Sequence, residues 1–142
     1  MCMSMCIYMV VVIYAIQDYL IEQLSGLMEP EQIITGGWDV NDSQTAIYLK
    51  DLGGSTRDWP DKRSDGLIQV VARAKNDFDA RKIANYAFSA LRELFRITLT
   101  FETTEYFINK IGAIQRPTPM GTSETGLYQY VNNYEVIFPE EI

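Results

Sequence analysis

TAIYLKDLGG at residues 45–54 and GLIQVVARAKNDFDARKIANYAFSALREL at residues 66–94 decide the fold of this chain. Apolar and polar residues alternate in 45–52 and again in 67–75, which is typical of strands in a sheet with one covered face. From Asp77 onward, apolar residues recur at helical spacing, and Asn76 or Asp77 can cap that helix. The two segments therefore predict paired strands followed by a helix that packs on their sheet.

The alternation also assigns side chains to the two faces of the predicted sheet. On the strand over 67–75, the residues expected to face the helix are Ile68, Val70, Ala72 and Ala74. Arg73 and Lys75 fall on the opposite, outer face, where they are either ordinary solvated residues or contacts for a partner. The sequence leaves both readings open.

The remaining segments complete a single domain over residues 1–142, with residues 1–7 expected to be disordered. The further predicted elements are a helix over Tyr8–Leu27, a short strand over Ile33–Gly37, the helix over Asp77–Phe95, strands over Ile97–Phe101, Phe107–Gln115 and Leu127–Phe138, and a Pro117–Gly121 linker. This order predicts an α+β fold, with a mainly antiparallel (mixed) sheet and two helices packed on one face.

Composition narrows the function classes. The chain has 142 residues, a hydrophobic fraction of 47% and a net charge of −7. Affinity for nucleic acid comes mainly from lysine and arginine on phosphates, so an acidic chain argues against direct DNA or RNA binding. The apolar run over 5–16 is shorter than the roughly 20 residues that span a bilayer, and we interpret it as the buried start of a helix rather than a membrane segment.

Histidine is absent from the sequence, and the two cysteines are Cys2 and Cys6. A structural zinc site needs about four ligands, so the sequence predicts no metal site. The glycine pairs Gly36–Gly37 and Gly53–Gly54 match neither a phosphate-binding nor a dinucleotide-binding motif. We therefore expect no cofactor. The serines have no histidine to activate them, and no pair of carboxylates stands out. The sequence therefore predicts a protein that is not an enzyme.

The polar loop over 53–66 is the most prominent candidate for an interaction site. Gly53 and Gly54 are expected to form the turn that ends the preceding strand. Trp59 lies between Arg57 and Arg63, and tryptophan and arginine are enriched at binding hot spots. Trp59 is either an interface anchor or a plug that folds back onto the core, and the sequence does not separate the two.

Three segments resemble a known family. They are residues 46–54 (AIYLKDLGG), residues 68–84 with the strand IQVVARAK and the helix opening DARKIA, and residues 114–137, where a Pro-Gly-rich turn precedes an aromatic strand. Together they resemble bacteriophage minor capsid proteins of the tail terminator (tail completion) type.

The resemblance implies a structural virion protein that is assembled in the host cytoplasm. Its members form a ring, usually a hexamer, that caps the tail tube, stops its polymerisation and presents the head–tail connector surface. The implied partners are further copies of the chain, the tail tube protein and a head-completion or stopper protein. DNA would pass through the lumen without specific binding.

Two alternatives remain at this stage. The first is a head-completion or stopper protein of the neck, which would bind the portal side and not the tail tube. The second is a small enzyme or ligand-binding domain with a site built from scattered carboxylates and tyrosines. On the tail terminator interpretation, the expected interface residues are Arg57, Trp59, Arg63, Arg73 and Lys75.

Overall fold

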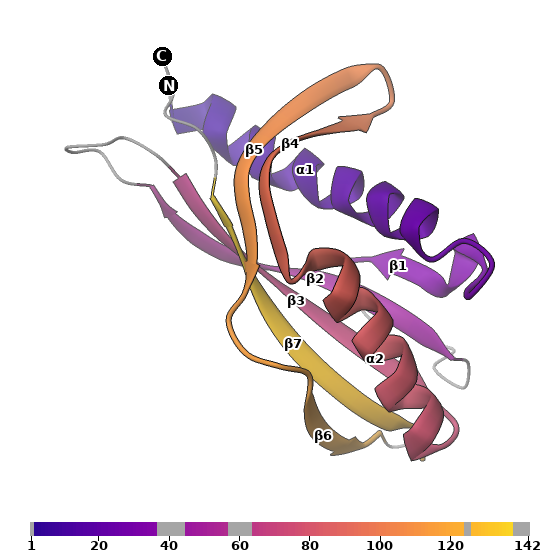
Figure 1. The fold of residues 1–142 in the computed structure, drawn as a ribbon. Helices are drawn as coiled ribbons and strands as arrows, with labels where there is room; N and C mark the ends of the chain where they lie inside the picture. The colour runs from indigo at the N-terminus through magenta and orange to yellow at the C-terminus, as the bar shows by residue number, and fades with distance from the viewer. Residues whose placement is uncertain (1, 37–44, 57–63, 124–125, 138–142) are drawn as a thin grey trace.

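The computed structural model describes residues 2–36, 45–56, 64–123 and 126–137, and in these ranges two long helices lie on one face of a curved sheet (Figure 1). The helices are α1 (Cys2–Gln23), the short 3-10 helix η1 (Pro30–Gln32) and α2 (Asp77–Leu91). The strands are β1 (Ile33–Thr35), β2 (Ala46–Thr56), β3 (Ser64–Ala74), β4 (Glu93–Phe101), β5 (Thr104–Ala113), β6 (Thr118–Thr122) and β7 (Tyr128–Ile137).

The strands form one mixed sheet in the order β1-β2-β3-β7-β5-β4, and β6 pairs separately with β7. Only the pairing of β1 with β2 is parallel among the described pairs, and the others are antiparallel. The predicted α+β class, with a mainly antiparallel sheet and helices on one face, is therefore confirmed.

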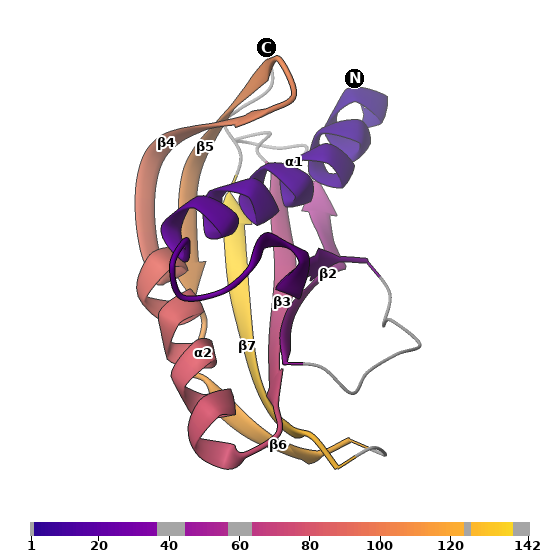
Figure 2. The ribbon, with the colours of Figure 1, turned by 90° about the vertical axis from the view of Figure 1, so that its right-hand side faces the viewer.

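The main core lies between this sheet and the two helices (Figure 2). The predicted inner face of β3 is confirmed, because its four apolar residues are buried against the helices. Residues from α1, α2, β2, β5 and β7 complete the core, including Ile16, Leu20, Ile47, Leu91, Ile108 and Tyr134. The opposite face carries a smaller buried cluster formed by Ala46, Tyr48 and Val71.

Both helices differ from the prediction at their ends. Helix α1 begins at Cys2, so it includes residues 2–7, for which no regular structure was predicted, and it ends at Gln23 rather than at Leu27. Helix α2 ends at Leu91, not at Phe95, and Leu94 belongs to strand β4. Leu94 continues the helical spacing of the apolar stripe, but the residues after it are rich in aromatic and β-branched types that favour a strand.

Two segments predicted as turn and linker are strands. Strand β2 continues through Gly53 and Gly54, which pair with Leu67 and Gly66 after a register shift beside Leu52. A β-bulge bends a strand without ending it, and glycine accommodates that change. The predicted linker Pro117–Gly121 contains strand β6, whose pairing with a single neighbour is compatible with Pro119.

The β4–β5 hairpin leaves the sheet and curves around α1 (Figures 1 and 2). Leu94 and Ile97 on β4 both pack on the core, as do Ile108 and Ile111 on β5. Inward-facing residues of a regular strand are an even number of positions apart, whereas these pairs are three apart. The inward and outward positions therefore change places once on each strand. At the break, Arg96 adopts a left-handed backbone conformation with φ +49°. The break keeps the apolar side of the hairpin facing α1 as the hairpin bends.

The bend predicts an unusual order of stability at position 96. A β-branched residue tolerates positive φ poorly, whereas glycine adopts it freely. We expect the Arg96→Gly variant to be more stable than the Arg96→Val variant, with an unfolding free energy higher by about 1–2 kcal/mol. Chemical denaturation measures these unfolding free energies. Thr98→Gly and Thr98→Val are the control pair on the same strand, and there the valine variant should be more stable than the glycine variant. The same order at both positions would contradict the account of the bend.

Candidate functional site

A groove with a volume of about 650 Å³ runs beside helix α2. One wall is the helix, the other is the connection between β5 and β6, and a residue of β7 contributes to the lining. The lining residues are Arg81, Asn85, Phe88, Arg92, Arg116, Pro117, Pro119 and Tyr130. Three of these eight side chains are guanidinium groups, so the groove is cationic although the whole chain has a net charge of −7.

The helical wall follows from the spacing of residues on α2. Arg81, Asn85, Phe88 and Arg92 are separated by four, three and four positions, which places them on one side of a helix. The buried positions Ala80, Ile83, Ala84, Ala87 and Leu91 hold the other side of α2 against the sheet. The helix thus has one stripe for the core and a neighbouring stripe for the groove.

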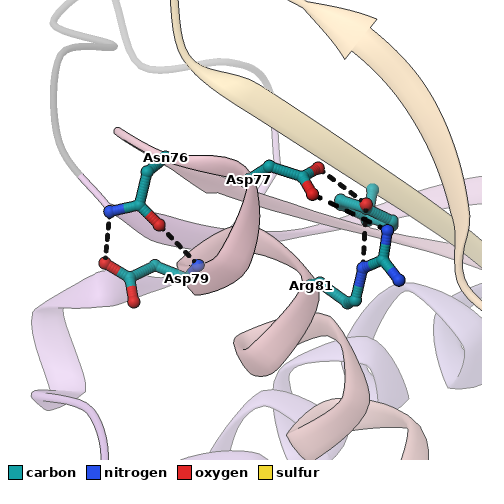
Figure 3. Close-up of polar contacts among 5 residues, drawn as sticks. Asn76, Asp77, Asp79 and Arg81 are labelled. Atoms are coloured by element: carbon teal, nitrogen blue, oxygen red, sulfur yellow. Dashed lines mark hydrogen bonds and ion pairs between the residues drawn. The ribbon is translucent and has the colours of Figure 1, made fainter.

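A polar network fixes the start of α2 to strand β7 and forms one end of the groove (Figure 3). The Arg81 Nε donates to the Tyr130 hydroxyl at 3.1 Å, and that hydroxyl donates to Asp77 Oδ1 at 2.7 Å. The Arg81 guanidinium also pairs with Asp77 Oδ2 at 3.6 Å. The hydrogen bond to Tyr130 raises the pKa of Arg81, and attraction to Tyr130 and Asp77 acts in the same direction.

The first turn of α2 is capped as the sequence predicted. The Asn76 side chain accepts a hydrogen bond from the Asp79 backbone N–H at 2.8 Å, and its amide donates to Asp79 Oδ2 at 2.9 Å (Figure 3). An N-cap of this kind satisfies one of the free N–H groups at the start of a helix. The cap and the Asp77 network therefore set where α2 begins and how it is placed over β7.

The groove offers a binding surface for anions. Arg92 and Arg116 are exposed, and their side chains make no ion pair with any part of the chain that the structure describes. Guanidinium groups bind carboxylates and phosphates through two parallel N–H donors. Within the described ranges, no group of three or more His, Cys, Asp or Glu side chains could hold a metal ion.

The structure separates the residues that the sequence proposed as an interface. Arg57, Trp59 and Arg63 lie outside the described residues. Lys75 is exposed directly after the end of β3. Arg73 lies on the predicted face of the sheet, but it is 6% exposed, so the expectation of an ordinary solvated side chain was wrong for it, and its contact with a partner stays a prediction.

Contacts within the chain explain the burial of Arg73. Its Nε donates to Gln129 Oε1 at 2.7 Å, and its guanidinium lies 5.2 Å from the centre of the Tyr48 ring. Strand pairing brings these residues together, since Arg73 is opposite both Ala46 on β2 and Gln129 on β7. The alternation pattern gave the correct face, but it could not show that neighbouring side chains cover that face.

The groove itself was missed in the sequence analysis. Its two walls are separated by more than twenty residues, from Arg92 to Arg116, and they meet only because β5 returns to the sheet beside α2. The spacing of Arg81, Asn85, Phe88 and Arg92 was the available signal. That signal resembles the ordinary solvated side of an amphipathic helix.

The structure is a single α+β domain with a curved mixed sheet, a projecting hairpin and a charged groove. The chain matches the family model of the bacteriophage tail terminator protein over residues 23–139, and it belongs to that family. It is therefore a structural protein of the phage tail, located in the virion. The resemblance drawn from the three sequence segments is thereby confirmed.

A solved structure supports the fold. One chain in the virion of a native gene transfer agent particle is similar with a TM-score of 0.52 and 11% sequence identity, and the match covers 86% of this chain and 92% of that chain. No curated protein sequence matches the chain. Among the described residues, no helix is long and apolar enough to cross a membrane.

The network at the start of α2 predicts energetic coupling between Tyr130 and Asp77. Tyr130→Phe removes the hydroxyl that joins Asp77 and Arg81, and we expect it to cost about 1 kcal/mol of unfolding free energy. In a double-mutant cycle with Asp77→Ala, the coupling energy should be about 0.5–1 kcal/mol.

Asp79 supplies the matched control, because it is an acidic residue in the same turn that bonds to Asn76 instead. Tyr130→Phe and Asp79→Ala should be additive to within about 0.5 kcal/mol in the same denaturation measurement. Equal coupling in both cycles would mean that the network seen here does not exist in solution.

Proposed function

We propose that this protein caps the tail tube of a long-tailed phage, stops its polymerisation and presents the surface that joins the head. The observation that carries the proposal is the family match, which extends from the end of α1 through β7. We further propose that the chain acts as a hexameric ring whose partners are the tail tube protein and a head-completion or stopper protein. This role requires neither catalysis nor a cofactor.

Features of the sheet support self-assembly. Strand β4 is the last strand of the sheet and has nine residues, and within the described chain its second edge pairs with no other strand. Unpaired edges are common sites of association between chains. The outer side of the same hairpin exposes Phe95 and Phe107, which are 57% and 41% accessible. A neighbouring copy would remove these apolar rings from water.

The charge of the chain supports a passage for DNA rather than a binding site for it. Nineteen acidic residues outnumber twelve basic ones. An acidic lumen would repel the phosphate chain and let it slide without specific contacts. In this proposal, the basic residues serve contacts between proteins.

The capping role predicts a direct effect on tube growth. When purified protein is added to polymerising tail tube protein, elongation should stop at a stoichiometry of about one ring for each tube end. Electron microscopy of tube lengths measures this, with an unrelated protein of similar acidic charge as the control. Unchanged tube lengths, together with binding to a head or portal complex, would favour the alternative of a stopper protein of the neck.

The proposed interface role of Trp59, with Arg57, Arg63 and Lys75, predicts a defect in assembly. Trp59→Ala should lower the fraction of assembled protein while the monomer keeps its unfolding temperature, because an exposed anchor contributes to association and not to the core. Native mass and thermal unfolding are measured together, and Trp38→Ala is the control at the other tryptophan of the chain. A destabilised monomer would instead place Trp59 in the core.

A further inference from the structure

The β4–β5 hairpin is an arm that ends far from the rest of the sheet. Among the described residues, strand β5 pairs with β7 through Lys110–Ala113, and Thr104–Ile108 pair with β4. The part of the arm beyond the pairing with β7 is about 20 Å long at the usual rise of a strand. The Tyr14 ring on α1 lies 5.6 Å from the Phe101 ring on β4, so the arm packs against the helix.

The tip of this arm, residues 102–105, is acidic and exposed. It consists of Glu102, Thr103, Thr104 and Glu105, and all four are exposed. Glu102 lies in the turn with φ +58°. Neither glutamate makes an ion pair with the described part of the chain. The tip therefore presents two exposed carboxylates at the end of the hairpin.

The groove beside α2 has the opposite charge and a suitable form. Two guanidinium groups with no ion pair among the described residues come from opposite walls, Arg92 at the C-cap of α2 and Arg116 on the facing connection. Phe88, Pro117 and Pro119 supply apolar wall between them. A volume of about 650 Å³ lies within the range of sites that take a small ligand.

The tip of a given chain cannot enter its own groove. Strand β4 begins at Glu93, next to the groove residue Arg92, and runs away from it. Phe101 lies eight positions after Glu93, which corresponds to about 25 Å along a strand. Both views show the hairpin running from the C-terminal end of α2 away to its tip (Figures 1 and 2). The two complementary surfaces can therefore meet only between different copies.

We infer that the acidic tip of one copy binds in the cationic groove of the next copy, and that this contact joins neighbouring subunits. The inference rests on the proposed ring. A contact between two different surfaces of the same chain is heterologous, and such contacts close into a ring when the rotation between subunits allows it. Carboxylates of the tip would pair with the Arg92 and Arg116 guanidinium groups, which make no ion pair with the described residues of their own chain.

Charge reversal tests the inference in a way that separates it from simple loss of stability. One variant carries Arg92→Glu and Arg116→Glu in the groove, and a second carries Glu102→Arg and Glu105→Arg at the tip. Each variant alone places like charges in contact, so the dissociation constant of the oligomer should rise at least tenfold. Native mass over a concentration series, with and without tail tubes, is the measurement.

The decisive sample is an equal mixture of the two reversed variants. In an alternating ring, every acidic tip then meets a basic groove and every basic tip meets an acidic groove, so assembly should return. The variant with all four substitutions should assemble for the same reason. Asp18→Arg with Glu22→Arg, on the exposed side of α1, is the matched control and should leave the mass unchanged.

Three results would overturn the inference. Reversed variants that assemble like the wild type would show that the contact is absent. Variants that fail alone and also fail in the mixture would show another role for these charges. A groove variant that forms normal rings but loses binding to tail tubes or to DNA would identify a different anionic partner. A wild-type chain that forms no oligomer, even on tail tubes, would instead refute the ring itself.

Discussion

Strand β7 pairs with β3 along one edge, and β5 and β6 share its other edge. The architecture depends on this division. The N-terminal half of β7 pairs with β6, through Thr118–Thr122, and its C-terminal half pairs with β5, through Lys110–Ala113. The backbone bond from Ile114 N–H to the Asn133 carbonyl lies at the transition. Since the described part of β7 pairs with β5 only through Lys110–Ala113, the rest of the β4–β5 hairpin can project from the sheet. Since the chain must then cross to β6, it forms a wall opposite α2. The projecting arm and the groove both follow from this one arrangement.

Much of the fold could be predicted from the sequence, because local patterns indicate whether a segment is a helix or a strand and which of its side chains face the core. Alternation correctly assigned Ile68, Val70, Ala72 and Ala74 to the core, and Asn76 marked the start of α2. Properties that depend on distant pairing could not be predicted. Gly53 and Gly54 are typical turn residues, yet β3 keeps them in a strand, and Arg73 is buried because Tyr48 and Gln129 approach it from neighbouring strands. The groove required two walls that are adjacent only in the folded chain.

The distribution of charge connects the structure to the family. In the proposed ring, an acidic chain around DNA would attract phosphate only weakly, but its copies would still have to recognise one another. A few arginines in a groove and a few glutamates on an arm would provide that recognition without making the whole surface basic. Electrostatic complementarity of this kind contributes mainly to specificity and register, whereas the apolar rings of Phe95 and Phe107 provide area for burial at the same hairpin.

The most direct test of this account is an electron cryomicroscopy reconstruction of tail tubes bearing the purified protein. The account predicts a closed ring at one end of the tube, with the residues 102–105 of each copy seated beside Arg92 and Arg116 of the next. A ring at the tube end with tip and groove apart would contradict the intersubunit contact. An unoccupied tube end, at concentrations where the protein is assembled, would contradict the capping role.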